Sequence, residues 1–159
     1  MRSAVSLILF FCVLNFSQAQ VNRVIDSLYT ELKHAKADTA IIKLKIELGI
    51  QWRLLNLDST LKYAKEIHAL SEKADYIEGL SKSVYMEGLV YYLQGDQQKA
   101  LPLYEESIRL LETLGDSKDL AKIYINTGVL YSATNNYSKA LDVYYKSLKI
   151  LEKLKEEKL

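Results

Sequence analysis

The chain has 159 residues, with 21 Lys and Arg against 20 Asp and Glu, so its formal net charge is +1. This near-neutral charge argues against a nucleic-acid surface or an anionic-membrane patch as the main function. The apolar content of 49% and charged content of 26% are typical of a folded protein, and the length fits one domain. A single cysteine excludes an internal disulfide and a cysteine-rich metal site.

The first nineteen residues have the pattern of a secretory signal peptide. Arg2 supplies the positive charge, residues 4–16 are almost entirely apolar, and Ser17 and Ala19 place small side chains where a signal peptidase reads. The apolar run is shorter than the ~20 residues that span a bilayer. We therefore expect cleavage after Ala19 and an exported chain, periplasmic or secreted, that starts at Gln20 and has no membrane span. An N-terminal anchor that is never cut stays open as the alternative.

Apolar residues recur at helical spacing through the rest of the chain. In the last segment Leu141, Leu148 and Leu151 fall at i, i+7 and i+10, on one face of a helix. Gly95-Asp96 and Asn135-Asn136 separate such stripes, because Gly or Asn ends one helix and Asp caps the next. One proline and six glycines leave little material for many short turns. We predict helices at residues 22–36, 39–55, 59–73, 78–94, 97–114, 118–134 and 137–156.

The second half of the chain repeats itself with a period of 40 residues. Helical hairpins that repeat at such a period stack into arrays. An earlier unit is less regular, with Thr60 at the alanine position and Ala64 at the second aromatic position. The residues that match between the two regular units are Gly88 and Gly128, Tyr91 and Tyr131, Ala100 and Ala140, Tyr104 and Tyr144, and Ser107 and Ser147.

This order of small, aromatic, alanine, aromatic and small residues resembles the signature of tetratricopeptide repeats. The resemblance implies an all-α fold, a right-handed superhelical array of antiparallel helix hairpins, in which the small residues lie where paired helices cross. Residues 20–159 would form one such domain, with an N-terminal helix near 22–36 and hairpins near 38–74, 78–114 and 118–156. The period is longer than the usual ~34 residues. Longer repeats of this kind are similar to the sensory regions of bacterial signal-transduction proteins.

Few residues suit catalysis. His34 and His68 lie on different predicted helices, and no cysteine or third ligand is suggested near either. No glycine-rich phosphate loop follows a strand, since no strand is predicted. We therefore expect no enzyme activity, no metal site and no cofactor.

The resemblance implies a binding function, because the first helices of such hairpins line a concave groove. We expect a non-catalytic exported scaffold that binds a protein or peptide there, as the sensory part of a signalling system. Equivalent positions of the three units are occupied by Lys43, Lys82 and Lys122. One lysine per unit would therefore face acidic groups of the partner. The alternative that these lysines are ordinary solvent-exposed helix residues stays open. The candidate groove residues are Lys43, Arg53, Lys82, Tyr85, Tyr92, Lys122 and Asn126.

The last predicted helix has an apolar face without a partner in the sequence. Leu141, Tyr144, Leu148 and Leu151 would meet a following hairpin, and the sequence continues only to Leu159. Either a longer protein supplies that hairpin or another molecule covers the face. The second reading makes the chain a structural spacer that forms a homodimer through its C-terminal hairpin.

Overall fold

A computed structural model describes the backbone of residues 2–157 and the side chains of residues 18–157. Over these residues the chain forms seven α-helices and no strand. For all but the first, the observed bounds differ from the predicted ones by at most three residues, because turn residues end each apolar stripe. The helices are α1 (Arg2–His34), α2 (Asp38–Trp52), α3 (Leu57–Lys73), α4 (Ile77–Leu93), α5 (Gln97–Glu112), α6 (Lys118–Ala133) and α7 (Tyr137–Glu156).

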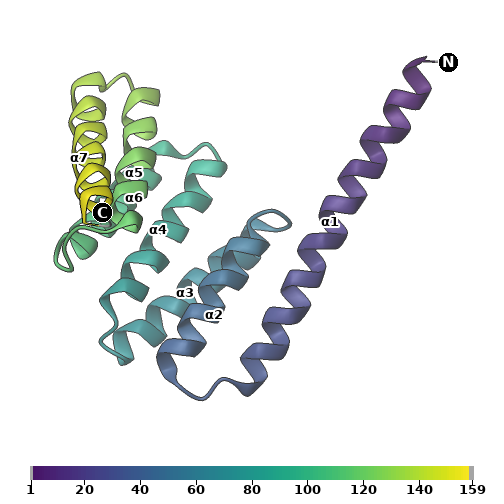
Figure 1. The fold of residues 1–159 in the computed structure, drawn as a ribbon, viewed down its shortest axis with the longest axis horizontal. Coiled ribbons are helices and arrows are strands. Elements are labelled where there is room, and N and C mark those ends of the chain that lie inside the picture. Colours follow the sequence, from purple (N-terminus) through teal and green to yellow (C-terminus); the bar gives the residue numbers. More distant parts are fainter. Residues whose placement is uncertain (1, 158–159) are drawn as a thin grey trace.

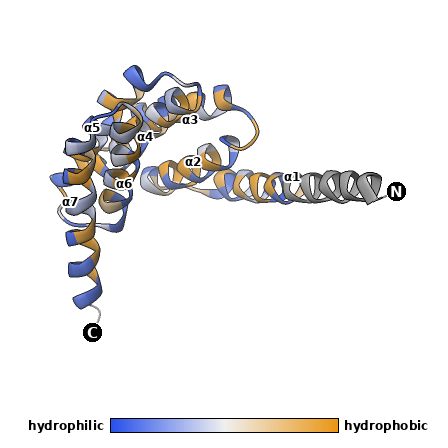
Figure 2. Ribbon diagram, turned by 90° about the horizontal axis from the view of Figure 1, so that it is seen from above, coloured by the Kyte–Doolittle hydropathy of each residue, from blue (hydrophilic) through white to orange (hydrophobic). Residues whose placement is uncertain are grey.

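The helices pack as three hairpins, α2 with α3, α4 with α5 and α6 with α7, preceded by α1 (Figure 1). This confirms the predicted all-α array of helix hairpins. Viewed from above, α2, α4 and α6 lie on the inner side of a curve, and α3, α5 and α7 lie on its outer side (Figure 2). The apolar faces of neighbouring helices meet between these two rows.

α1 is one continuous helix that begins at Arg2, so the predicted start of the first helix near residue 22 is wrong. Ile25 is buried and Leu28 partly buried against α2 and α3. The predicted signal peptide falls largely on residues 1–17, whose side chains lie outside the described part of the chain. Its cleavage stays a prediction.

The helix ends follow the expected local chemistry. Gly95 and Asn135 have positive φ angles of 83° and 60°, a conformation in which most side chains are strained, and they follow the last turns of α4 and α6. The side chains of Asn56, Asp96 and Ser117 each accept a hydrogen bond from the third backbone N–H that follows. These caps satisfy amides that the helices leave free.

Within two of the hairpins, a glycine of the first helix receives a tyrosine ring of the second. A Cβ atom placed on Gly88 would lie 2.8 Å from Cδ1 of Tyr104, which is 2% exposed. A Cβ on Gly128 would overlap Tyr144, whose ring supplies all three of its nearest atoms. Tyr144 therefore faces its own hairpin, which corrects the prediction that it lies on the face left for a following one. These contacts bring the paired helices close together.

In the first hairpin, a different residue fills the space beside the glycine. Ala64 stands at the tyrosine position, so no ring reaches Gly49 from α3. Met86 of α4 fills the space instead, with its Sδ atom 2.6 Å from where a Cβ on Gly49 would be. Because of this insertion, α2 and α4 contact each other directly.

Buried serines join the paired helices at the second small position. The hydroxyls of Ser81 and Ser107 lie 2.8 Å apart, and each also lies 2.9 Å from the other's backbone carbonyl oxygen. One period later, Ser147 Oγ donates to the carbonyl of Ala121 over 2.9 Å. Both signature serines are almost completely buried, and these bonds satisfy their hydroxyl groups.

Tyr131, at the first aromatic signature position, links successive hairpins. Its hydroxyl donates to the carboxylate of Glu105 on α5. Burial and this hydrogen bond raise the pKa of Tyr131 to about 12, so the phenol stays neutral at physiological pH. Lys139 lies over its ring at 5.4 Å, and Lys99 lies over Tyr91 at the same distance one period earlier.

The contact between Gly128 and Tyr144 makes a testable prediction about stability. Gly128→Ala should lower the free energy of unfolding by about 1–3 kcal/mol, because the added methyl group overlaps the tyrosine ring. In a Tyr144→Ala background the same substitution should be neutral, or stabilising by up to about 1 kcal/mol, since alanine favours a helix over glycine. Urea denaturation of the four proteins measures this. Equal destabilisation in both backgrounds would contradict the packing.

Candidate functional site

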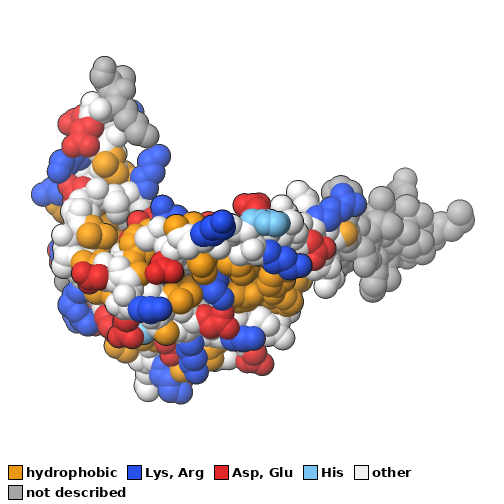
Figure 3. All heavy atoms as spheres, turned by 90° about the horizontal axis from the view of Figure 1, so that it is seen from below, with side chains coloured by type: hydrophobic (Ala, Val, Ile, Leu, Met, Phe, Trp, Pro, Cys, Tyr) orange, Lys and Arg blue, Asp and Glu red, His pale blue; other side chains and the backbone are white. Residues whose placement is uncertain are grey.

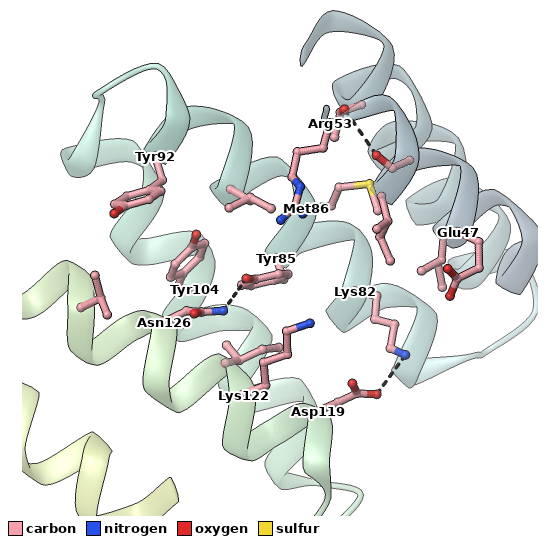
Figure 4. Close-up of a pocket in the computed structure, with 17 residues that line it drawn as sticks. Glu47, Arg53, Lys82, Tyr85, Met86, Tyr92, Tyr104, Asp119, Lys122 and Asn126 are labelled. Carbon is pink, nitrogen blue, oxygen red and sulfur yellow. Dashed lines mark hydrogen bonds and ion pairs between the residues drawn. The ribbon is translucent and has the colours of Figure 1, made fainter. Parts of the chain in front are cut away.

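A cavity of about 480 Å³ lies among the three inner helices α2, α4 and α6 (Figure 4). The space-filling view shows that the molecule is hollowed beside the C-terminal helix (Figure 3). Most of the cavity lining is apolar, and Met86 and Tyr104, which pack against inner-helix glycines, form part of it. The apolar lining also includes Ile46, Ile50, Leu89, Ile123 and Val129.

Tyr85 occupies the centre of the lining. Its ring lies 4.9 Å from that of Tyr104, centroid to centroid, and its hydroxyl accepts a hydrogen bond of 2.6 Å from Nδ2 of Asn126. Burial raises the pKa of Tyr85, so the side chain is neutral. The bond to Asn126 connects α4 to α6 and fixes the ring as a flat wall of the cavity (Figure 4).

Lys82 also connects α4 to α6. Its Nζ atom lies 3.1 Å from Glu78 and 2.9 Å from Asp119. Burial alone would lower the pKa of Lys82, but the hydrogen bonds and charges of the two carboxylates outweigh it and raise the pKa. Lys82 is therefore neutralised within its own chain, which corrects the expectation that it faces a partner's acidic groups.

Two cations of the cavity remain available. Arg53, directly after the last residue of α2, and Lys122 on α6 are both exposed, and among the described residues neither forms an ion pair. Glu47 contributes one carboxylate to the same lining. A ligand would therefore meet an apolar cavity with two solvent-facing positive charges and one negative charge.

The structure brings six of the seven predicted groove residues together around this cavity: Arg53, Lys82, Tyr85, Tyr92, Lys122 and Asn126. The seventh, Lys43, is exposed on an earlier turn of α2 and does not line it. The prediction that one lysine per unit faces the partner is therefore wrong, because Lys122 is the one lysine of the three whose ammonium group is free in the cavity. Sequence reasoning missed Met86, Asp119 and Glu47, because their roles depend on which helices become neighbours.

Other kinds of site find little support in the described residues. No group of three His, Cys, Asp or Glu side chains in residues 18–157 is arranged to hold a metal ion. His68 lies 3.2 Å from the hydroxyl of Ser83 and 3.6 Å from Glu72, on the surface of α3. Within the described residues, no helix is long and apolar enough to cross a bilayer.

Comparisons with known proteins agree with this architecture. The family model for the tetratricopeptide repeat matches residues 84–153, which contain the signature residues of both regular units. No curated protein sequence matches the chain.

Solved structures share the fold at low sequence identity. BtubC (BKLC) from P. vanneervenii is 17% identical, with a TM-score of 0.70 over 86% of this chain and 59% of its own. The apo form of RapI is 16% identical, with a TM-score of 0.66 over 89% of this chain and 50% of its own. The chain thus spans little more than half the length of these proteins. Residues 84–153 thus match the tetratricopeptide repeat, and the described chain as a whole has the stacked-hairpin fold of a helical-repeat protein of this type.

Proposed function

We propose that this chain is a non-catalytic scaffold that binds an extended segment of another protein in the groove formed by α2, α4 and α6. The observation that carries the proposal is the cavity of about 480 Å³ at the centre of that groove. Its walls are apolar, and Arg53 and Lys122 add free charges beside them. A site of this composition typically binds an apolar group that has polar or charged groups on either side.

The groove is organised before any ligand arrives. The bonds Lys82–Asp119 and Tyr85–Asn126 hold α4 and α6 at a fixed separation. Because these side chains are already positioned, a ligand would not have to bear the entropic cost of ordering them. Arg53 and Lys122 lie on opposite sides of Tyr85 in Figure 4.

The chemistry of the lining favours a particular class of peptide. A large apolar side chain would enter the cavity and stack on Tyr85, and carboxylates before and after it would pair with Arg53 and Lys122. Asn126 uses its amide N–H₂ for Tyr85, so its carbonyl oxygen would accept a bond from the peptide backbone. This ligand is an extended acidic segment with a bulky apolar residue.

We also propose that the scaffold is exported and serves in sensing. The support is the pattern of residues 1–19 and the resemblance of the long repeats to sensory regions of signalling proteins. Cleavage after Ala19 would leave the part of α1 that contains Ile25 and Leu28, which pack against the array. The repeat domain would therefore keep its first helix after processing.

The groove is tested by charge reversal. A library of random dodecapeptides displayed on phage should yield binders enriched in Asp or Glu next to a large apolar residue. The double variant Arg53→Glu/Lys122→Glu should bind the selected peptides at least about tenfold more weakly, which corresponds to ~1.4 kcal/mol, because both attractive charges become repulsive. Isothermal titration calorimetry measures the affinities.

A matched control comes from the outer row of helices. Lys65→Glu/Arg109→Glu reverses one exposed lysine on α3 and one exposed arginine on α5, outside the groove. This control should bind as the unchanged chain does. If both double variants bind equally well, the groove is not the binding surface.

Export makes a separate prediction. When the full chain is produced in a bacterial host, N-terminal sequencing of the periplasmic or secreted protein should begin at Gln20. Ala19→Asp should block processing, because a signal peptidase requires a small residue there. Protein that begins at Met1 in both cases would show that the segment is retained.

A further inference from the structure

The outer face of α7 exposes more large apolar side chains than any other helix in the described residues. Apolar residues continue along this helix toward its C-terminal end (Figure 2). Exposed clusters of this size usually mark an interaction surface. The exposed side chains are Tyr137 (61%), Leu141 (70%), Tyr145 (58%), Leu148 (50%) and Leu151 (41%), and we call them the α7 face.

The preceding hairpin shows how this kind of surface is covered. Ile108 and Leu111 of α5 occupy the positions of Leu148 and Leu151 one period earlier, and they are only 8% and 2% exposed. They are buried in one cluster with residues of α6, the first helix of the next hairpin. The α7 face is therefore equivalent to the surface by which one hairpin packs on the next. A helix is the kind of element that would cover it.

We propose that the α7 face is covered by the α7 face of a second copy of this chain, in an antiparallel pair about a twofold axis near Tyr145. A twofold pair uses the same exposed surface on both copies and closes on itself. A head-to-tail contact with α1 is a poorer fit, because the described part of α1 exposes Val24 and Tyr29 at only 39% and 37%. Such a contact would also build a ring or an open filament in place of a dimer.

The charges on α7 favour the antiparallel direction. In that direction Leu141 lies opposite Leu148 of the second copy, and Asp142 lies near Lys149 of the second copy. In a parallel pair, each flank of the face would meet the opposite flank of the second copy, so Asp142 and Lys149, which lie on the same flank, would not meet. Opposite charges beside an apolar seam set the orientation of paired helices.

The size of the face predicts a weak, reversible dimer. Five side chains that are about half exposed offer roughly 600 Å² per copy, or ~1,200 Å² in total, at the lower limit for specific interfaces. We therefore expect dimers at concentrations of about 100 μM and monomers on dilution.

Sedimentation equilibrium of the full chain tests the proposal. The unchanged chain should shift from monomer to dimer with concentration, and Leu141→Lys/Leu148→Lys should stay monomeric with an unchanged circular dichroism spectrum. The matched control Val24→Lys/Leu54→Lys replaces two exposed apolar side chains, 39% and 61%, on α1 and in the turn after α2, at the other end of the array from α7, and it should dimerise normally. A monomer at ~100 μM in the unchanged chain, or equal dimerisation of both variants, would overturn the proposal.

Disulfide trapping tests the direction of the pair. The only cysteine, Cys12, is first replaced by serine. Tyr145→Cys then lies next to the twofold axis and should form a disulfide with the second copy. Tyr137→Cys should not, because in an antiparallel pair its two copies lie about 15 residues, or ~22 Å, apart along the helices. Equal trapping of both variants would rule out the antiparallel arrangement.

Discussion

The packing of a tyrosine ring against a helical glycine is the contact on which the rest of the array depends. At Gly88 and Gly128 the missing side chain lets the second helix of a hairpin bring its tyrosine across the first. This contact turns Tyr104 and Tyr144 inward, and it places the opposite side of each first helix on the inner curve. Most of the cavity lining comes from α2, α4 and α6 on the inner curve, and Thr60 of α3 and Tyr104 of α5 reach it from the outer row.

The charges of the groove divide into a structural set and a free set. Lys82 is held by Glu78 and Asp119, and its role is to fix α4 against α6. Arg53 and Lys122 face solvent and are the charges that a ligand can use. The tyrosines divide in a similar way. Those at signature positions pack between helices, and one of them, Tyr104, also reaches the cavity, whereas Tyr85 and Tyr92 line the cavity from outside the signature. An aromatic excess in this chain therefore reports mainly on packing.

Much of the fold follows from the sequence because its signals are local or periodic. Turn residues such as Gly95 mark the helix ends, and the 40-residue period marks the hairpins. The site is less predictable, because it depends on contacts between residues far apart in the chain. The pairing of Lys82 with Asp119 and the insertion of Met86 under Gly49 arise only once the hairpins stack. The prediction that Lys43 lines the groove is wrong for the same reason. Equivalent positions in a repeat need not face the same space when one unit is irregular.

Nuclear magnetic resonance mapping of a bound acidic–apolar peptide is the most direct test of the groove as the binding surface. Amide and side-chain signals of ¹⁵N-labelled protein would be followed through a titration. The largest shifts should fall on α2, α4 and α6, with the guanidinium of Arg53 and the amide of Asn126 among them, and α3 and α5 should change little. Shifts concentrated on the outer helices, or spread evenly over the array, would contradict the assignment of function to the inner curve.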